Sequence, residues 1–120
     1  MCIRDSLIEI CKNSQVSANI NFSEINFLPS VIDLANEGII PGGTKRNLDY
    51  AEKFAHFSES LSPTQKLLAC DAQTSGGLLI SCEEKYAEDI INDINKNSTY
   101  KSCIIGQFIN KKENSIIVNE

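Results

Sequence analysis

Residues 71–80 constrain this chain most, because they place an acid, an amide, two hydroxyls and two glycines directly before an apolar run. Consecutive glycines allow positive φ and a close approach to a ligand, and N–H groups in such a turn can bind an anion. The hydroxyls of Thr74 and Ser75 would extend that concavity, which suits phosphate. The alternative is a tight turn into a buried strand, with Asp71 and Thr74 bonded to their own backbone. The residues alone leave both interpretations open.

A second segment of similar composition lies at residues 41–47. It joins Gly42 and Gly43 to a hydroxyl, two cations and an amide, in the order Thr44, Lys45, Arg46 and Asn47. These are donor groups that phosphate oxygens favour. Neither glycine pair has the spacing of a P-loop or of a dinucleotide-binding turn, so the common nucleotide motifs are absent. The segment is expected to form a loop.

Apolar spacing and capping residues predict the helices. Residues 7–12 read as the end of one helix, and Pro29 suits the first turn of a second that Gly38 ends. The buried face of that second helix is expected to hold Val31, Ile32, Leu34 and Ala35. Residues 62–65 form a capping box with proline at the first helical position, which opens a helix through about Ala69. A last helix has an amphipathic stripe that is expected to lie in the core: Tyr86, Ala87, Ile90, Ile91 and Ile94.

Strands are predicted at residues 18–22, 78–82, 102–109 and 115–118. The last two are expected to form a strand pair joined through the polar turn at 110–114. Residues 48–57 fit either a short helix or an irregular segment. The predicted fold class is therefore α/β (α+β), with two-layer packing of helices on a mixed β-sheet.

Composition narrows the function classes. A net charge of −5 and a pI near 4.9 argue against a nucleic-acid partner, which needs a clustered positive face. No apolar run is long enough for a membrane span, no signal peptide is recognisable, and the expected compartment is the cytoplasm. The five cysteines include no C-x-x-C pair, so neither a metal site nor disulfides are expected. Cys70, Cys82 and Cys103 adjoin apolar residues and are expected in the core. His56 is expected to be a packed or surface residue.

Taken together, residues 38–48 and 71–79 closely resemble the C-terminal domain of the selenophosphate synthetases, the selenide, water dikinase family of the aminoimidazole ribonucleotide synthetase-like superfamily. The resemblance covers residues 7–120, which it identifies as a single C-terminal domain of a truncated synthetase, with residues 1–6 as a stub foreign to the family. Cys2 and Asp5 match neither the family's nucleophile motif nor its magnesium aspartate motif.

The resemblance implies an enzyme that makes selenophosphate from selenide and ATP with Mg²⁺, releasing AMP and phosphate. It places the nucleophile, the catalytic lysine and most metal carboxylates in an N-terminal ATP-binding half. No catalytic or metal residue is then expected in this chain, and neither ATP nor Mg²⁺ should bind it tightly alone. The intact enzyme is expected to be a homodimer. The residues that match family motifs are expected to line or brace a cleft shared with the other half: Gly42, Gly43, Thr44, Asn47, Asp71, Gln73, Thr74, Ser75, Gly76 and Gly77.

Other interpretations stay open at this point. The chain could be a stand-alone module that binds a phosphorylated metabolite or a nucleotide. It could belong to a related enzyme such as aminoimidazole ribonucleotide synthetase. Both glycine segments could also be purely structural, forming turns and a domain interface. Under the enzyme interpretation, Gly76 and Gly77 are expected to adopt backbone geometries that side chains resist.

Overall fold

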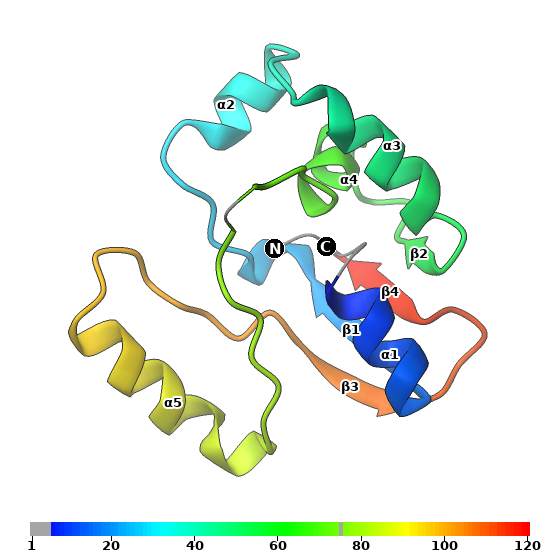
Figure 1. Ribbon diagram of the computed structural model, residues 1–120. Helices are drawn as coiled ribbons and strands as arrows, with labels where there is room; N and C mark the ends of the chain where they lie inside the picture. The colour runs from blue at the N-terminus through cyan, green and yellow to red at the C-terminus, as the bar shows by residue number, and fades with distance from the viewer. Residues whose placement is uncertain (1–5, 75) are drawn as a thin grey trace.

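A computed structural model describes residues 6–74 and 76–120, so the sequence predictions for Cys2, Asp5 and Ser75 lie outside the described residues. Helices pack against a four-stranded mixed sheet (Figure 1), which confirms the predicted fold class. The strands are β1 (Val16–Asn21), β2 (Ala55–Phe57), β3 (Gly106–Asn110) and β4 (Ile116–Asn119). Their order in the sheet is β2-β4-β1-β3, with β1 antiparallel to β3 and β4 parallel to both β1 and β2.

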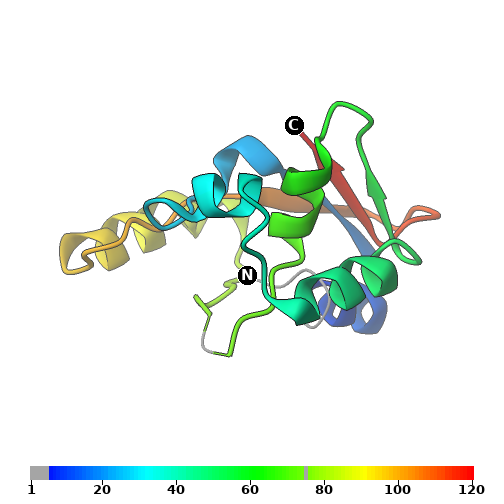
Figure 2. The ribbon, with the colours of Figure 1, turned by 90° about the horizontal axis from the view of Figure 1, so that it is seen from above.

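One face of the sheet carries the core. The register aligns Ala18 with Ile116 and Ile20 with Val118, and β2 continues these two rows with Ala55 and Phe57. All six side chains are buried because successive residues of a strand alternate between the two faces. Helix α1 (Ile8–Ser14) adds Ile8 and Cys11 to the same cluster. Figure 2 shows α1 on the same side of the sheet as α3 (Gly42–Ala51).

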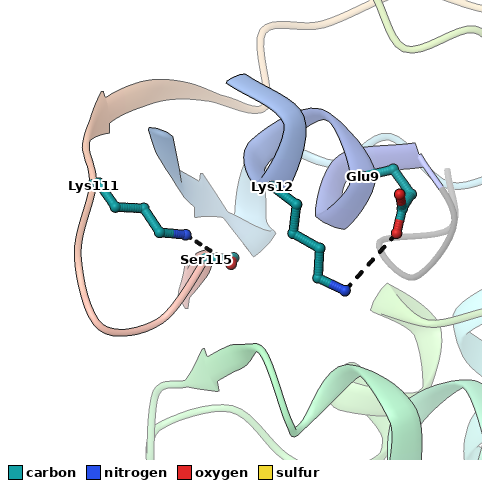
Figure 3. A network of polar contacts seen from close by, with 4 residues as sticks. All are labelled: Glu9, Lys12, Lys111 and Ser115. Carbon is teal, nitrogen blue, oxygen red and sulfur yellow. Dashed lines mark hydrogen bonds and ion pairs between the residues drawn. The ribbon is translucent and has the colours of Figure 1, made fainter. Parts of the chain in front are cut away.

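Polar and aromatic contacts tie the end of α1 to its neighbours. The Lys12 ammonium lies 3.7 Å from the centroid of the Phe54 ring and 3.8 Å from the Glu9 carboxylate. Lys111 donates a 3.1 Å hydrogen bond to the Ser115 hydroxyl across the β3–β4 connection (Figure 3). Burial raises the pKa of the Cys11 thiol, an effect that the charge of Lys111 partly opposes. The contacts of Lys12 connect α1 with the segment that follows α3.

Two predicted helix ends are confirmed. Helix α2 (Val31–Asn36) stops at Gly38, whose φ is +83°, and the N–H of Ile39 bonds to the Leu34 carbonyl as in a Schellman motif. Helix α4 (Pro63–Ala69) begins with the complete capping box: Ser62 accepts from the Gln65 N–H, and the Gln65 side chain accepts from the Ser62 N–H.

The predicted buried face of α2 is largely wrong. Only Ala35 is buried, while Ile32 and Leu34 are 47% and 42% exposed. Six residues make fewer than two turns, so little of such a helix can face one neighbour. Pro29 lies outside the helix, and Ser30 precedes it in the left-handed region. The apolar residues therefore remain at the surface around α2.

The C-terminal third also departs from prediction. Residues 78–82 form no strand, and Leu78 is 93% exposed. The strand predicted at 102–109 begins only at Gly106, and β3 does not pair with β4 because β1 lies between them. Apolar alternation predicted these strands without indicating which strand pairs with which.

Helix α5 (Glu84–Lys96) forms as predicted, but none of its residues is buried, so its apolar stripe is not part of the core. Figure 1 shows α5 away from the other helices, with extended segments leading to and from it. Among the cysteines, Cys70 is buried as predicted, Cys82 is exposed and Cys103 is half-buried. His56 is exposed on β2. Over the described ranges, no helix is long and apolar enough to cross a membrane.

Candidate functional site

The first glycine pair does not form the loop that its composition predicted. Gly42 and Gly43 are the first two residues of α3, which continues to Ala51. Pro41 precedes the helix with a φ of −56°, and the N–H of Thr44 bonds to the Pro41 carbonyl at 2.9 Å. Proline has this φ built in, and with a ψ of 136° Pro41 is the N-cap residue just outside the helix, which forms even though glycine is a weak helix former. No side chain caps this end of α3.

Thr44 is fully buried, and its hydroxyl makes two hydrogen bonds to the second glycine segment. It donates to Asp71 Oδ1 at 3.1 Å and accepts from the Ala72 N–H at 3.1 Å. Both the donor and one acceptor position of the hydroxyl are therefore used within the protein.

Asn47 lies one turn further along α3 and is 6% exposed. Its Nδ2 donates to the Cys70 carbonyl at 3.1 Å. Gly43 lies against the same stretch, because a Cβ at that position would be 3.2 Å from the Ala72 Cβ. One side of α3 thus contacts three consecutive residues at the start of the second segment.

The rest of the second segment is an exposed connection without helix or strand. Asp71 and Ala72 are half-buried, whereas Gln73, Thr74 and both glycines are exposed. The Gln73 amide approaches Asp71 Oδ2 at 3.5 Å, the limit of a hydrogen bond. The predicted strained geometry is wrong for Gly77, which is not among the described glycines with positive φ. A Cβ at Gly76 would meet the movable end of the Gln73 side chain, and one at Gly77 would meet nothing within 4 Å.

An apolar hollow of about 160 Å³ adjoins this junction. Asp71 and Thr44 line its polar side, and the remaining lining residues come from α2, from α4 and from the connection at residues 39–41. Its apolar lining consists of Val31, Leu34, Ala35, Ile39, Ile40, Pro41, Leu67 and Leu68. Sequence reasoning missed this hollow because its walls come from three separate segments.

The accessible groups of the site favour an anion. Gly42, Lys45 and Arg46 are exposed at the start of α3, where the helix dipole and uncapped N–H groups attract negative charge. Thr74 adds an exposed hydroxyl. Within residues 6–74 and 76–120, no group of three or more histidine, cysteine or acidic side chains could hold a metal ion.

The structure therefore brings Gly43, Thr44 and Asn47 together with residues 70–72, and it leaves residues 73, 74, 76 and 77 exposed. Sequence reasoning missed the roles of the Cys70 carbonyl and the Ala72 N–H. The spacing of Thr44 and Asn47 could have indicated that both contact the same neighbour, since residues three apart on a helix share one face. Reading residues 41–47 as a loop concealed it.

Comparison with known proteins finds relatives over most of the chain, although no family model matches it. It is 38% identical over 109 residues to the selenide, water dikinase of Aliarcobacter butzleri, covering 91% of this chain and 32% of that protein. The selenide, water dikinase of Clostridioides difficile is 34% identical over 111 residues, covering 92% and 32%. That of Photobacterium profundum is 47% identical over 76 residues, covering 62% and 21%. The chain spans about a third of the length of the first of these relatives.

Proposed function

Because the chain belongs, over the stretch that these relatives match, to the selenide, water dikinase family, we propose that it supplies one domain of an enzyme that makes selenophosphate. In this proposal, selenide, ATP and water are the substrates, and AMP and phosphate are the other products: one phosphoryl group of ATP goes to selenide and the other to water. The observation that carries the proposal is the presence of both glycine segments in a chain related over nine-tenths of its length to such enzymes.

The chemistry explains why a domain without a nucleophile is useful to this reaction. Phosphoryl transfer depends on positioning and on neutralising charge more than on covalent chemistry from the protein. The exposed start of α3 and residues 73–77 offer N–H groups, hydroxyls and two cations to phosphate oxygens. ATP, when bound, would supply the transferred phosphoryl group. The donors of this chain would orient it.

The donor set fits phosphate better than it fits magnesium. Asp71 is the carboxylate closest to the proposed donors, and one of its oxygens already accepts from Thr44. We therefore assign the carboxylates that would hold Mg²⁺ to the other two-thirds of such an enzyme. The same reasoning assigns the nucleophile there, so the isolated chain should not turn over ATP with selenide. In this proposal the working enzyme is a cytoplasmic homodimer, with the ATP-binding portion as the partner of this domain.

A structural role is favoured for part of the predicted site. Thr44 and Asn47 are buried and bonded to residues 70–72, so they do not face a ligand in this arrangement. Of the residues predicted to hold phosphate, Gly42, Gln73, Thr74, Gly76 and Gly77 are the exposed ones within the described chain. Thr44, Asn47 and Gly43 are better described as supports for them.

A chimera tests the proposal directly. The region of the Aliarcobacter butzleri enzyme that matches this chain would be replaced by the corresponding residues of this chain, and selenide-dependent AMP formation measured with ATP and Mg²⁺. We expect activity within about tenfold of the parent enzyme, a difference of ~1.4 kcal/mol in barrier. The matched controls are the parent with that region deleted and the isolated chain, both of which should be inactive. A folded, soluble chimera that forms no AMP would contradict the proposal.

A further inference from the structure

We propose that Thr44 is a positioning residue, whose hydroxyl sets the place of residues 72–74 relative to the start of α3. The inference rests on the proposed function only where it concerns bound phosphate. The positioning itself concerns contacts within this chain. The Thr44 hydroxyl is buried and is not one of the exposed groups proposed to bind phosphate, so the positioning gives it a separate role.

The hydroxyl of Thr44 bonds to this chain's own residues, although Thr44 also lines the apolar hollow. Its side chain is 0% exposed, whereas the Thr74 side chain in the same site is exposed. A buried hydroxyl must find its partners within the protein, and Thr44 finds both in the second segment, at Asp71 Oδ1 and the Ala72 N–H. The two bonds act on adjacent residues, so they fix both the position and the direction in which the chain leaves α4.

Two neighbours of Thr44 on α3 also restrict the path of the chain after α4. Asn47 holds the Cys70 carbonyl, one residue before Asp71. Gly43 lets Ala72 approach so closely that even a methyl group there would be in tight contact. Residues 70, 71 and 72 are thereby held by one side of the same helix whose N-terminus carries the exposed donors. The consequence is that donors from both glycine segments keep a fixed mutual geometry, which binding a phosphate between them requires.

Hydrogen exchange on this chain tests the positioning without any need for enzyme activity. Thr44→Val keeps the shape of the side chain but removes the hydroxyl. It should speed exchange of the Ala72 amide by about tenfold, the order expected when a protecting hydrogen bond is lost. Thr44→Ser keeps the hydroxyl and should restore slow exchange at Ala72.

The matched control is Ile116→Val, which removes one methyl group from the core in β4 and touches none of these contacts. It should lower overall stability while leaving exchange at Ala72 at the wild-type rate. If Thr44→Val exchanges at Ala72 no faster than Ile116→Val, the hydroxyl does not position the segment and the inference is wrong.

The chimera then separates this inference from the proposed function. With wild-type Thr44 the chimera should be active, and Thr44→Val should lower kcat/KM by roughly tenfold with a rise in KM for ATP, whereas Thr44→Ser should not. An inactive wild-type chimera would contradict the proposed function and leave the exchange result to decide the positioning. An active chimera that Thr44→Val leaves unchanged would contradict a role of this positioning in phosphate binding.

Discussion

The two glycine segments both contain a glycine pair, a threonine and an amide side chain, but their structures differ. Residues 42–47 are helical, and two of their polar side chains are buried in hydrogen bonds to another segment. Residues 73–77 have neither helix nor strand where they are described, and their described side chains are exposed. The first segment holds residues 70–72 in place, and the second segment continues from them. Similar composition therefore does not imply a similar role.

The context of each glycine pair accounts for the difference. The first pair follows Pro41, the N-cap residue of α3, and the turn after the pair continues with residues that a helix tolerates. The second pair follows the end of α4, and α3 holds the chain just before it, at residues 70–72. A glycine pair therefore takes its conformation from what precedes it and from what holds it. Substitutions in the two segments should differ accordingly.

The largest effect is expected for Thr44→Val. Loss of the hydroxyl leaves the Ala72 N–H without its acceptor and removes the Thr44 donor from Asp71 Oδ1, which should lower the free energy of unfolding by about 1–3 kcal/mol. Urea denaturation monitored by circular dichroism measures it. A midpoint equal to that of the wild type would mean that the two segments are not held together in solution.

A somewhat smaller loss, about 1–2 kcal/mol, is expected for Asn47→Ala, because the buried Cys70 carbonyl loses the donor that Asn47 supplies. Asn47→Asp tests the hydrogen bond itself, because it changes the donor with little change in shape. A carboxylate cannot donate to a carbonyl, so this nearly isosteric change should destabilise at neutral pH and recover partly at acidic pH, where the carboxyl is protonated. Thermal unfolding at both pH values checks it, and equal stability of wild type and Asn47→Asp at neutral pH would refute the assignment.

Alanine at Gly42 should raise the free energy of unfolding by about 0.5 kcal/mol, because alanine favours a helix and nothing lies within 4 Å of the added Cβ. Gly43→Ala is the control on the same turn. Its Cβ would lie 3.2 Å from the Ala72 Cβ, so the helical gain should be reduced or lost. The two melting temperatures should therefore differ in favour of Gly42→Ala, and the reverse order would argue against the close approach of α3 to Ala72.

The smallest effect on stability is expected for Thr74→Val, below about 0.5 kcal/mol, since the side chain is exposed. Activity provides the contrast. If the Thr74 hydroxyl holds a phosphoryl group in the transition state, the chimera with Thr74→Val should lose roughly tenfold in rate. Melting temperature and AMP formation are measured on the same preparation. Unchanged activity would leave this segment as a structural connection.

Features that depend on neighbouring residues could be predicted from the sequence. The capping box at Ser62 and the glycine stop at Gly38 use groups three or four residues apart, so local chemistry was sufficient. The general layering of helices on a mixed sheet followed from apolar spacing. Only part of the helix at residues 42–51 is predicted from the sequence. The segment that could be a short helix was residues 48–57, whereas the helix begins at Gly42.

Features that depend on a distant partner could not be predicted. The apolar stripe of α5 and the run at 78–82 indicate a preference for burial, but apolar spacing does not specify what covers them. The order of the strands could not be predicted for the same reason: β1, which is distant in sequence, lies between β3 and β4. At the candidate site, the residue types were informative about phosphate, while the division between Thr44 as support and Thr74 as exposed group depended on burial.

The central position of β1 and β4 in the sheet also determines when this fold can form. These adjacent strands come from far apart in the chain, and the bond between the Asn119 and Asn19 side chains joins residues 100 positions apart. Pairings of such long range close slowly, because a large loop must be ordered before the contact stabilises it. During synthesis, β1 would wait with its apolar face uncovered until β4 has left the ribosome. Early association with a chaperone or with another part of the enzyme would shorten that exposure.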